Sequence, residues 1–144
     1  ILDIAPYVAG KSQAKPGVRV AKLSSNETPL GASPLAIKAF VESATGLHRY
    51  PESGALRLCQ AIATANGLDA ARVVCGAGSD ELIGLLIRSY CAPGDNIVIS
   101  QYGFLMYRIY AQGCGVQTIL APEKNLRTDV SAMLAAVNEK TKIV

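Results

Sequence analysis

The stretch at residues 76–81, GAGSDE, has residue types that could bind a phosphate group. Small residues let the backbone approach a ligand closely, and the free amides at a helix start, at the positive end of the helix dipole, favour an anion. Ser79 is a residue type that caps such a helix. Asp80 and Glu81 repel a phosphate unless their side chains point away from it or meet a cation. The stretch therefore predicts either a phosphate site or a tight turn capped by its own polar residues.

Two further segments carry aromatic side chains in positions that suit contact with a ligand. Tyr50 precedes a proline, so its backbone is extended and its phenol projects from a loop. Tyr102 and Phe104 follow an expected strand end, where open α/β sheets place their ligands, and an aromatic ring there can stack on a flat ring. Neither segment needs to bind a ligand. Tyr50 could instead be a surface tyrosine packed on its neighbours, and the side chains after residue 100 could instead pack the next helix against the core, which suits Met106 and Tyr107.

The cysteines and the histidine form no familiar reactive or metal-binding pattern. The four cysteines are far apart in sequence, and His48 is the only histidine, so the sequence predicts no metal site. The cysteines stand among apolar neighbours, which predicts reduced, mostly buried thiols in a cytoplasmic protein. They are Cys59, Cys75, Cys91 and Cys114.

Alternating strands and helices must position these residues. From residue 72 onward, segments rich in Val and Ile alternate with helical patterns over short connections. This order predicts an α/β fold with a mostly parallel sheet, helices on both of its faces and right-handed crossovers. Strands are expected at 72–75, 96–100, 116–120 and 142–144, and helices at 34–46, 53–66, 79–90, 104–112 and 129–138.

The first 33 residues differ from the rest, because prolines and glycines interrupt short apolar pieces. We expect residues 1–33 to form an irregular N-terminal arm and residues 34–144 to form the first part of a larger domain. Ser33 and Pro34 are expected to begin the first helix, as its cap and its first residue. Residues 142–144 read as the start of a buried strand, so the sequence is expected to be a piece of a longer protein.

Composition limits the classes of function. The chain has 144 residues, 50% of them hydrophobic and 17% charged, with a net charge of +3. A chain this apolar is not a disordered charged tail. The basic residues are spread along the chain, so no nucleic-acid partner is expected, and the apolar runs are too short to cross a membrane.

Taken together, the motifs resemble those of histidinol-phosphate aminotransferases, a family of pyridoxal-phosphate enzymes of the aspartate aminotransferase fold (fold type I). Residues 22–31, KLSSNETPLG, resemble the Asn-Glu-Asn-Pro-x-Gly opening of such enzymes, with Thr28 in place of the second asparagine. Residues 49–52, RYPE, resemble their Tyr-Pro-Asp loop, and GAGSDE resembles their Gly-x-Gly-Ser-Asp-Glu turn. The resemblance covers nearly the whole chain, with the motifs in the family's order.

The resemblance implies roles for the matched residues. The turn with Gly78, Ser79 and Asp80 would hold the cofactor phosphate, and Phe104 would stack on the pyridine ring. Tyr102 is the alternative residue for stacking, because Tyr102 and Gly103 stand at the positions where the family commonly has proline and threonine.

Further implications concern the substrate, a second subunit and the reaction. Tyr7 and Asn26 match positions near the substrate. Tyr50 would reach across a homodimer to the partner's cofactor, and the arm would contact the small domain and the second subunit. The implied reaction transfers an amino group between L-histidinol phosphate and 2-oxoglutarate in histidine biosynthesis.

The family's Schiff-base lysine, its aspartate at the pyridine nitrogen and its substrate-carboxylate arginine are all expected beyond residue 144. This stretch alone is therefore expected to be inactive, with no catalytic residue of its own. Alternatives are an aromatic or other amino-acid aminotransferase, a related phosphothreonine decarboxylase, or a non-catalytic phosphate-binding α/β module. None of the lysines matches the family's lysine motif; they are Lys11, Lys15, Lys22, Lys38, Lys124, Lys140 and Lys142.

Overall fold

A computed structural model describes residues 4, 6–8, 17 and 26–144 of the chain. Five α-helices and three β-strands follow one another in the described part. The helices are α1 (Pro34–Ser43), α2 (Leu56–Asn66), α3 (Gly78–Tyr90), α4 (Leu105–Gly113) and α5 (Val130–Ala135). The strands are β1 (Asn96–Ser100), β2 (Gln117–Ala121) and β3 (Thr141–Ile143), and short 3₁₀ turns lie at Ala44–Gly46, Ser53–Ala55 and Ala70–Arg72.

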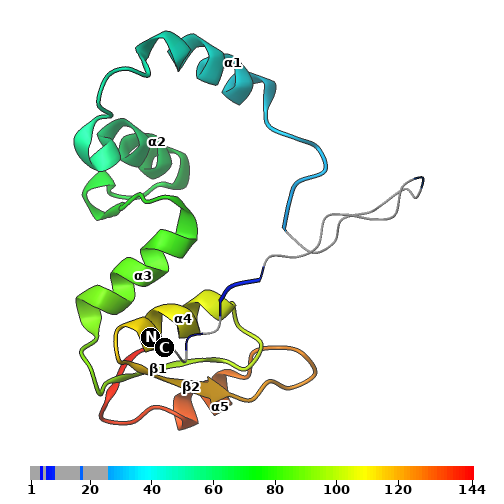
Figure 1. Ribbon diagram of the computed structural model, residues 1–144, viewed down its shortest axis with the longest axis vertical. Helices are drawn as coiled ribbons and strands as arrows, with labels where there is room; N and C mark the ends of the chain where they lie inside the picture. Colours follow the sequence, from blue (N-terminus) through cyan, green and yellow to red (C-terminus); the bar gives the residue numbers. More distant parts are fainter. Residues whose placement is uncertain (1–3, 5, 9–16, 18–25) are drawn as a thin grey trace.

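The three strands form a parallel sheet in the order β2-β1-β3. All five residues of β1 pair with β2, whereas β3 pairs with β1 only near its start, at Asn96 and Ile97. Helix α4 lies on one face of the sheet and α5 on the other (Figure 1). The predicted α/β class, the parallel sheet and the helices on both faces are confirmed.

The core of this sheet forms around β1, whose successive side chains point to opposite faces of the sheet. Ile97 and Ile99 are buried on the face that α3 and α4 cover, where they pack with Ile87 and Ala111. Val98 is fully buried. A strand with its neighbouring side chains buried on both faces needs the continuous apolar run that residues 97–99 supply.

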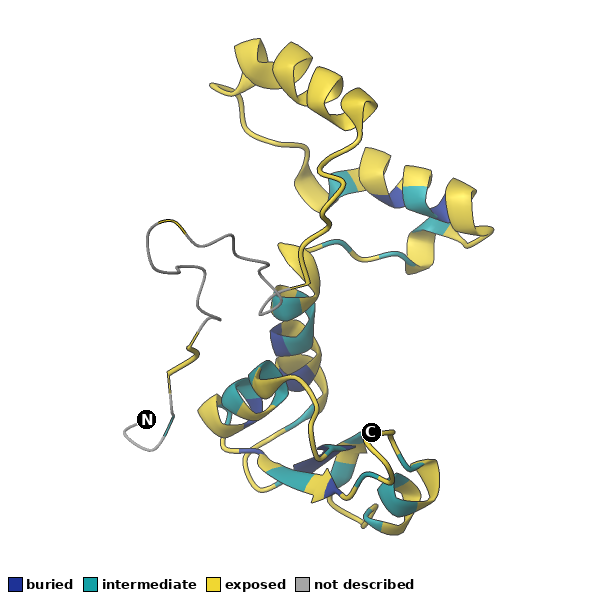
Figure 2. Cartoon of the chain, turned by 90° about the vertical axis from the view of Figure 1, so that its right-hand side faces the viewer, coloured by how far each residue is buried: buried dark blue, intermediate teal, exposed yellow. Residues whose placement is uncertain are grey.

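The helices before the sheet are much less covered. Helices α1 and α2 lie away from the sheet, and α1 has no buried residue (Figure 2). The chain exposes 11887 Å², whereas a compact monomer of 15.1 kDa exposes roughly 7,100 Å². Large apolar side chains account for part of the excess; Leu35, Phe40 and Val41 of α1 are all more than half exposed.

Several local expectations were wrong. Residues 72–75 are not a strand: Arg72 ends a 3₁₀ turn, and the extended residues after it pair with no strand in the described ranges. Helix α5 ends at Ala135, three residues short of its expected end at residue 138. Of the four thiols, Cys59 is buried and the other three are partly exposed, so the expectation of mostly buried thiols does not hold.

The helix caps also differ in part. Ser33 precedes α1 as expected, but its side chain makes no capping hydrogen bond to the described helix. Asp129 does cap α5, because its Oδ1 accepts a hydrogen bond from the amide of Ala132 at 3.1 Å. Gly67 ends α2 in the left-handed conformation that glycine favours, with φ of 65°.

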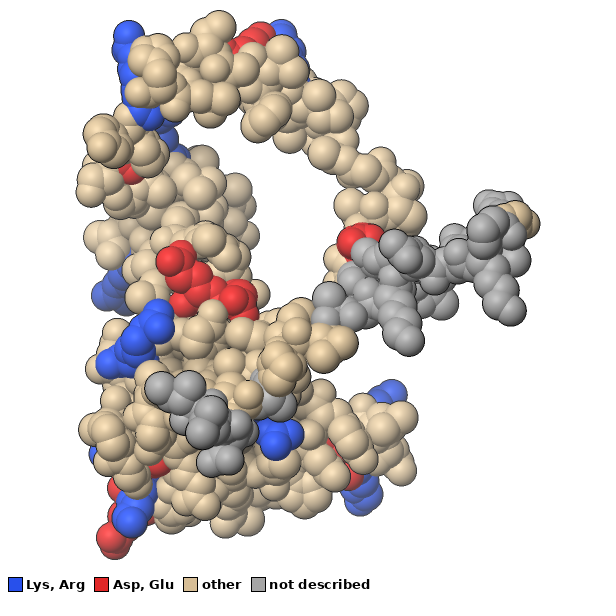
Figure 3. Space-filling view, in the orientation of Figure 1, with Lys and Arg blue, Asp and Glu red and all other residues tan. Residues whose placement is uncertain are grey.

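The visible face carries scattered basic side chains and one group of acidic side chains near its middle (Figure 3). Lys and Arg side chains are scattered over several elements in Figure 3, with acidic side chains between them. None of the described helices is both long enough and apolar enough to cross a membrane.

Candidate functional site

The turn before α3 has a backbone that suits an anion. Gly78 has a φ of +79°, and a Cβ built on it would meet no atom within 4 Å, so the backbone there is open. The amide of Gly78 donates to the carbonyl of Gly76 at 2.8 Å, which closes the turn. The amides of Ser79 and Asp80 lie in the first turn of α3, where no earlier helical carbonyl can accept from them. They stand at the positive end of a helix of 13 residues.

The two acidic side chains of the turn are held by the protein itself. Glu81 folds back so that its Oε2 accepts a hydrogen bond from the amide of Ala77 at 2.6 Å. Asp80 Oδ2 accepts a hydrogen bond from the hydroxyl of Tyr110 at 2.9 Å. No side-chain cap hydrogen bond is made at the start of α3 among the residues that the structure describes, so the expectation that Ser79 caps the helix is wrong; Glu81 bonds instead to the amide of Ala77, which precedes the helix. Both carboxylates are tied to fixed donors instead of being free to turn toward an anion at the amides of Ser79 and Asp80.

Tyr110 of α4 is the residue that couples α4 to this turn. A Cβ on Gly84 of α3 would come within 2.9 Å of the Tyr110 ring, so the absence of a side chain there lets the ring lie against α3. The guanidinium of Arg88 lies 6.0 Å from the ring centroid. The hydrogen bond to Asp80 is the main reason that the pKa of Tyr110 is raised above 10.0. Asp80 Oδ1 is buried without a partner among the described residues, so the Tyr110 hydroxyl is the donor that stabilises this carboxylate.

Phe104 lies at the start of α4 within a small aromatic group. Its ring centroid is 6.4 Å from that of Tyr107, with the planes at 86°, and 6.4 Å from that of Tyr7, with the planes at 79°. Both pairs have the edge-to-face geometry that aromatic rings favour. The structure thus brings Tyr7 of the arm and Phe104, nearly 100 positions apart, into contact. Phe104 remains 45% exposed, so its ring is available to a further partner.

Three of the expected site residues are not brought to this group. Tyr50 lies between α1 and α2 and is 100% exposed. Tyr102 is 66% exposed, and its amide donates to Glu123 Oε1 at 3.3 Å. Asn26 is exposed at the start of the segment that leads to α1. The roles expected for Tyr50, Tyr102 and Asn26 stay predictions.

The carboxyl end of β1 carries a polar cluster that the sequence reasoning missed. The hydroxyl of Ser100 donates to Glu123 Oε1 at 2.5 Å, and the hydroxyl of Thr128 donates to Ser100 Oγ at 3.3 Å. Glu123 follows β2, so the cluster joins the ends of two neighbouring strands. The signal that could have found it is the position of Glu123 just after a strand end in a parallel sheet.

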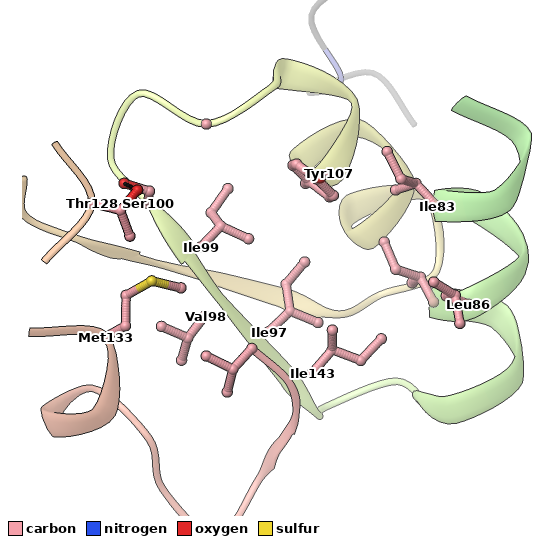
Figure 4. Close-up of a pocket in the computed structure, with 13 residues that line it drawn as sticks. Ile83, Leu86, Ile97, Val98, Ile99, Ser100, Tyr107, Thr128, Met133 and Ile143 are labelled. Atoms are coloured by element: carbon pink, nitrogen blue, oxygen red, sulfur yellow. Dashed lines mark hydrogen bonds between the residues drawn. The ribbon is translucent and has the colours of Figure 1, made fainter. Parts of the chain in front are cut away.

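An apolar cavity of about 280 Å³ lies along the edge of β1 beyond its pairing with β3. Ile83, Leu86 and Tyr107 line one side and Met133 lines the other, as Figure 4 shows. Ser100, Tyr107 and Thr128 are the polar residues of its lining, and no charged side chain is part of that lining. The cavity therefore does not suit a phosphate group, and the α3 turn is the better candidate for one.

Comparison with known proteins agrees with this arrangement. The family model for aminotransferases of class I and II matches residues 18–144. The chain belongs to this aminotransferase family. The match includes the α3 turn, Phe104 and the whole sheet.

The aminotransferase chain is also similar over its full length to curated proteins. It is 57% identical over 144 residues to a histidinol-phosphate aminotransferase of Rhodospirillum rubrum, and 55% identical over 145 residues to one of Rhodopseudomonas palustris. In both comparisons 100% of this chain is matched. The chain spans about 40% of the length of these relatives.

Solved structures show the same fold. The histidinol-phosphate aminotransferase of Sinorhizobium meliloti, crystallised with pyridoxal-5'-phosphate, superposes with a TM-score of 0.76 at 28% identity, covering 81% of this chain and 32% of that one. The tyrosine aminotransferase of Leishmania infantum has a TM-score of 0.68 at 20% identity over 76% of this chain and 34% of its own, which shows the fold alone.

Proposed function

We propose that this aminotransferase chain is the amino-terminal part of a histidinol-phosphate aminotransferase. The complete enzyme transfers the amino group between L-histidinol phosphate and 2-oxoglutarate in histidine biosynthesis. The observation that carries the proposal is the identity of 57% along the whole chain to a protein of that name. Because the chain spans about 40% of such relatives, it supplies only part of the active site.

The cofactor of the proposed enzyme is pyridoxal phosphate, which supplies an electron sink for reactions at the amino-bearing carbon. The open backbone of Gly78 and the first-turn amides of Ser79 and Asp80 fit its phosphate. The bonds of Asp80 to Tyr110 and of Glu81 to Ala77 support this assignment, because they hold the two carboxylates away from the donors. Phe104, or Tyr102 in its place, stacks on the ring.

Other residues are assigned to the substrate and to a second subunit. Tyr7 and Asn26 contact the substrate, and the contact of Tyr7 with Phe104 supports a position of Tyr7 near the cofactor. Tyr50 reaches the cofactor of the second subunit of a homodimer. Its full exposure and the uncovered apolar side chains of α1 support such a partner.

The proposed enzyme acts in the cytoplasm, in keeping with four cysteines present as free thiols. The Schiff-base lysine lies in the part of the enzyme that follows residue 144. Residues 1–144 alone are therefore expected to show no transamination, and turnover by this stretch would mean that the lysine is misplaced.

The test uses the purified full-length enzyme with added pyridoxal phosphate. We expect an absorbance band of bound cofactor that borohydride removes, and 2-oxoglutarate consumption that depends on L-histidinol phosphate. A cofactor band with turnover of aromatic or other amino acids instead indicates the rival aminotransferases, and carbon dioxide release from phosphothreonine indicates the decarboxylase. If no reducible band forms, the proposal is wrong and the non-catalytic phosphate-binding module is favoured.

A further inference from the structure

Two of the four thiols lie against each other beside the phosphate turn. Cys59 is on α2 and is 6% exposed, whereas Cys75 is partly exposed in the extended segment that leads to the turn. Their Sγ atoms are 3.6 Å apart, although 16 positions separate them in sequence. Cys59 Sγ also lies 3.6 Å from the carbonyl oxygen of Gly54, to which it donates. The two sulfur atoms are therefore already in contact in the reduced protein.

We propose that Cys59 and Cys75 are an oxidant-sensitive pair that closes a reversible disulfide bond next to the turn at residues 76–79. A disulfide has a sulfur–sulfur distance of about 2.05 Å, so the two Sγ atoms need to approach by about 1.5 Å. The segment around Cys75 pairs with no strand among the described residues. Within the described part of the chain, it can therefore move toward α2 without breaking a sheet hydrogen bond.

The chemistry is a two-electron oxidation by a peroxide. The thiolate of Cys75, the more accessible sulfur, attacks a peroxide oxygen, which breaks the O–O bond and gives a sulfenic acid and hydroxide. The hydroxide takes up the proton that the thiol released and leaves as water. The sulfur of Cys59 then attacks Cys75 Sγ, forms the S–S bond and expels the sulfenic oxygen as a second water. Two thiol protons and two electrons pass to hydrogen peroxide, which is reduced to two molecules of water. A dithiol reductant reverses the reaction by exchange.

The pKa of Cys75 determines how the rate of this oxidation should depend on pH. The hydrogen bond between the two thiols, followed by burial, raises the pKa of Cys75 above 9.0. The thiolate is then a small fraction at neutral pH, so oxidation speeds up as the pH rises toward that pKa. Such a pair stays reduced in a reducing compartment and responds to strong oxidative conditions.

The remaining two cysteines serve as controls within the same chain. Cys91 and Cys114 pack against the core cluster beside the sheet. Burial is the main cause that raises the pKa of Cys91 above 9.0, with smaller contributions from Asp95 and Cys114, so Cys91 is not an unusually acidic thiol either. Oxidation that is selective for the pair must therefore come from the 3.6 Å contact rather than from an unusually acidic thiol.

Closing the bond should weaken phosphate binding, a consequence that rests on the proposed function. Cys75 directly precedes Gly76, whose carbonyl accepts the hydrogen bond that shapes the turn. Pulling Cys75 toward α2 shifts Gly76, and with it the amides of Ser79 and Asp80. Donors that bind an anion need to be held to within about 0.5 Å. The oxidised enzyme is therefore expected to bind pyridoxal phosphate at least several-fold more weakly than the reduced enzyme.

The test treats the full-length enzyme with increasing hydrogen peroxide and maps its peptides by mass spectrometry without reduction. We expect one cross-linked peptide pair joining Cys59 to Cys75, a loss of two thiols per chain and full recovery with dithiothreitol. Cys59→Ser should abolish the cross-link, whereas Cys91→Ser should leave it unchanged. The affinity for pyridoxal phosphate is then measured before and after oxidation, for the wild type and for Cys59→Ser.

The outcomes separate the two claims. Three results would contradict the proposal that Cys59 and Cys75 are an oxidant-sensitive pair: a cross-link between other cysteines, oxidation of all thiols at equal rates, or no loss of thiols. A Cys59–Cys75 cross-link with unchanged cofactor affinity would support the disulfide but contradict its proposed effect on phosphate binding at the turn. Absence of cofactor binding in the reduced enzyme would instead count against the proposed function, because the peptide map does not depend on the cofactor.

Discussion

Replacing Tyr110 by phenylalanine tests the link between α4 and the phosphate turn. The change removes the hydroxyl that donates to Asp80 Oδ2 at 2.9 Å and leaves the ring in place against Gly84. Asp80 Oδ1 is already buried without a partner in the described part of the chain, so the carboxylate loses its donor from Tyr110 with no second one at hand. A hydrogen bond to a charged group contributes about 1.5–3 kcal/mol. Because the Tyr110 side chain is only half-buried and solvent screens the bond, we expect the free energy of unfolding to fall by the lower end of that range.

The assay is urea unfolding of the full-length enzyme without cofactor, followed by circular dichroism. The midpoint should fall while the slope stays unchanged, because the surface exposed on unfolding is the same. Tyr90→Phe is the matched control, since Tyr90 lies at the end of α3 with 66% of its surface exposed. Removing an exposed hydroxyl should change the free energy of unfolding by less than about 0.5 kcal/mol.

The same variant should also bind pyridoxal phosphate more weakly. Without the hydroxyl of Tyr110, the carboxylate of Asp80 is free to turn toward the amides of Ser79 and Asp80. There it competes with the phosphate for these donors and repels it. If Tyr110→Phe and Tyr90→Phe have the same unfolding midpoint and the same cofactor affinity, the hydrogen bond does not hold the carboxylate and the reasoning is refuted.

Three further predictions concern the core and the titrating groups. Ile97→Val in the buried centre of β1 should lower the free energy of unfolding by about 0.5–1.5 kcal/mol in urea titrations, and no change would show a loosely packed sheet. The raised pKa of Tyr110 means that the native state favours the neutral phenol, a stabilisation complete below pH 10.0 and lost as the pH rises through the raised pKa. Wild-type stability should therefore fall more steeply above pH 10.0 than that of Tyr110→Phe, and equal slopes would contradict the assignment. Cys59→Ala should lower the pKa of Cys75 and speed its alkylation by iodoacetamide, because the hydrogen bond to Cys59 is the main cause of the raised pKa; an unchanged rate would exclude that cause.

The parallel sheet could be predicted from the sequence because its signals are local. Residues 97–99 are a continuous apolar run, which is typical of a strand buried on both faces, and short connections with helices between the strands require parallel neighbours. Residues 72–75 have similar composition but form no strand. A strand exists only when a second strand lies beside it, and a short apolar run does not contain that information.

The position of the phosphate turn could be predicted from the sequence, but its backbone conformation and hydrogen bonds could not. Small residues before a helix indicated the position, but Ser79 makes no cap to the described helix, and Glu81 accepts instead from the amide of Ala77. The backbone at Gly78 has a left-handed φ of +79°, a conformation that the residue types before the helix allow but do not specify. The bond between Asp80 and Tyr110 joins residues 30 positions apart, and only the packing of α3 on α4 brings them together.

The central claim is that the backbone amides at the start of α3 bind the phosphate of pyridoxal phosphate. Ser79→Pro deletes one of these amides at a helix start, where proline is tolerated, and Ser79→Ala removes only the hydroxyl. The measurement is the affinity of the full-length enzyme for pyridoxal phosphate and for pyridoxal, which lacks the phosphate. We predict that Ser79→Pro binds pyridoxal phosphate about tenfold or more weakly than Ser79→Ala, with no difference for pyridoxal. Equal affinities of the two variants for pyridoxal phosphate, or an equal loss for both ligands, would contradict the claim.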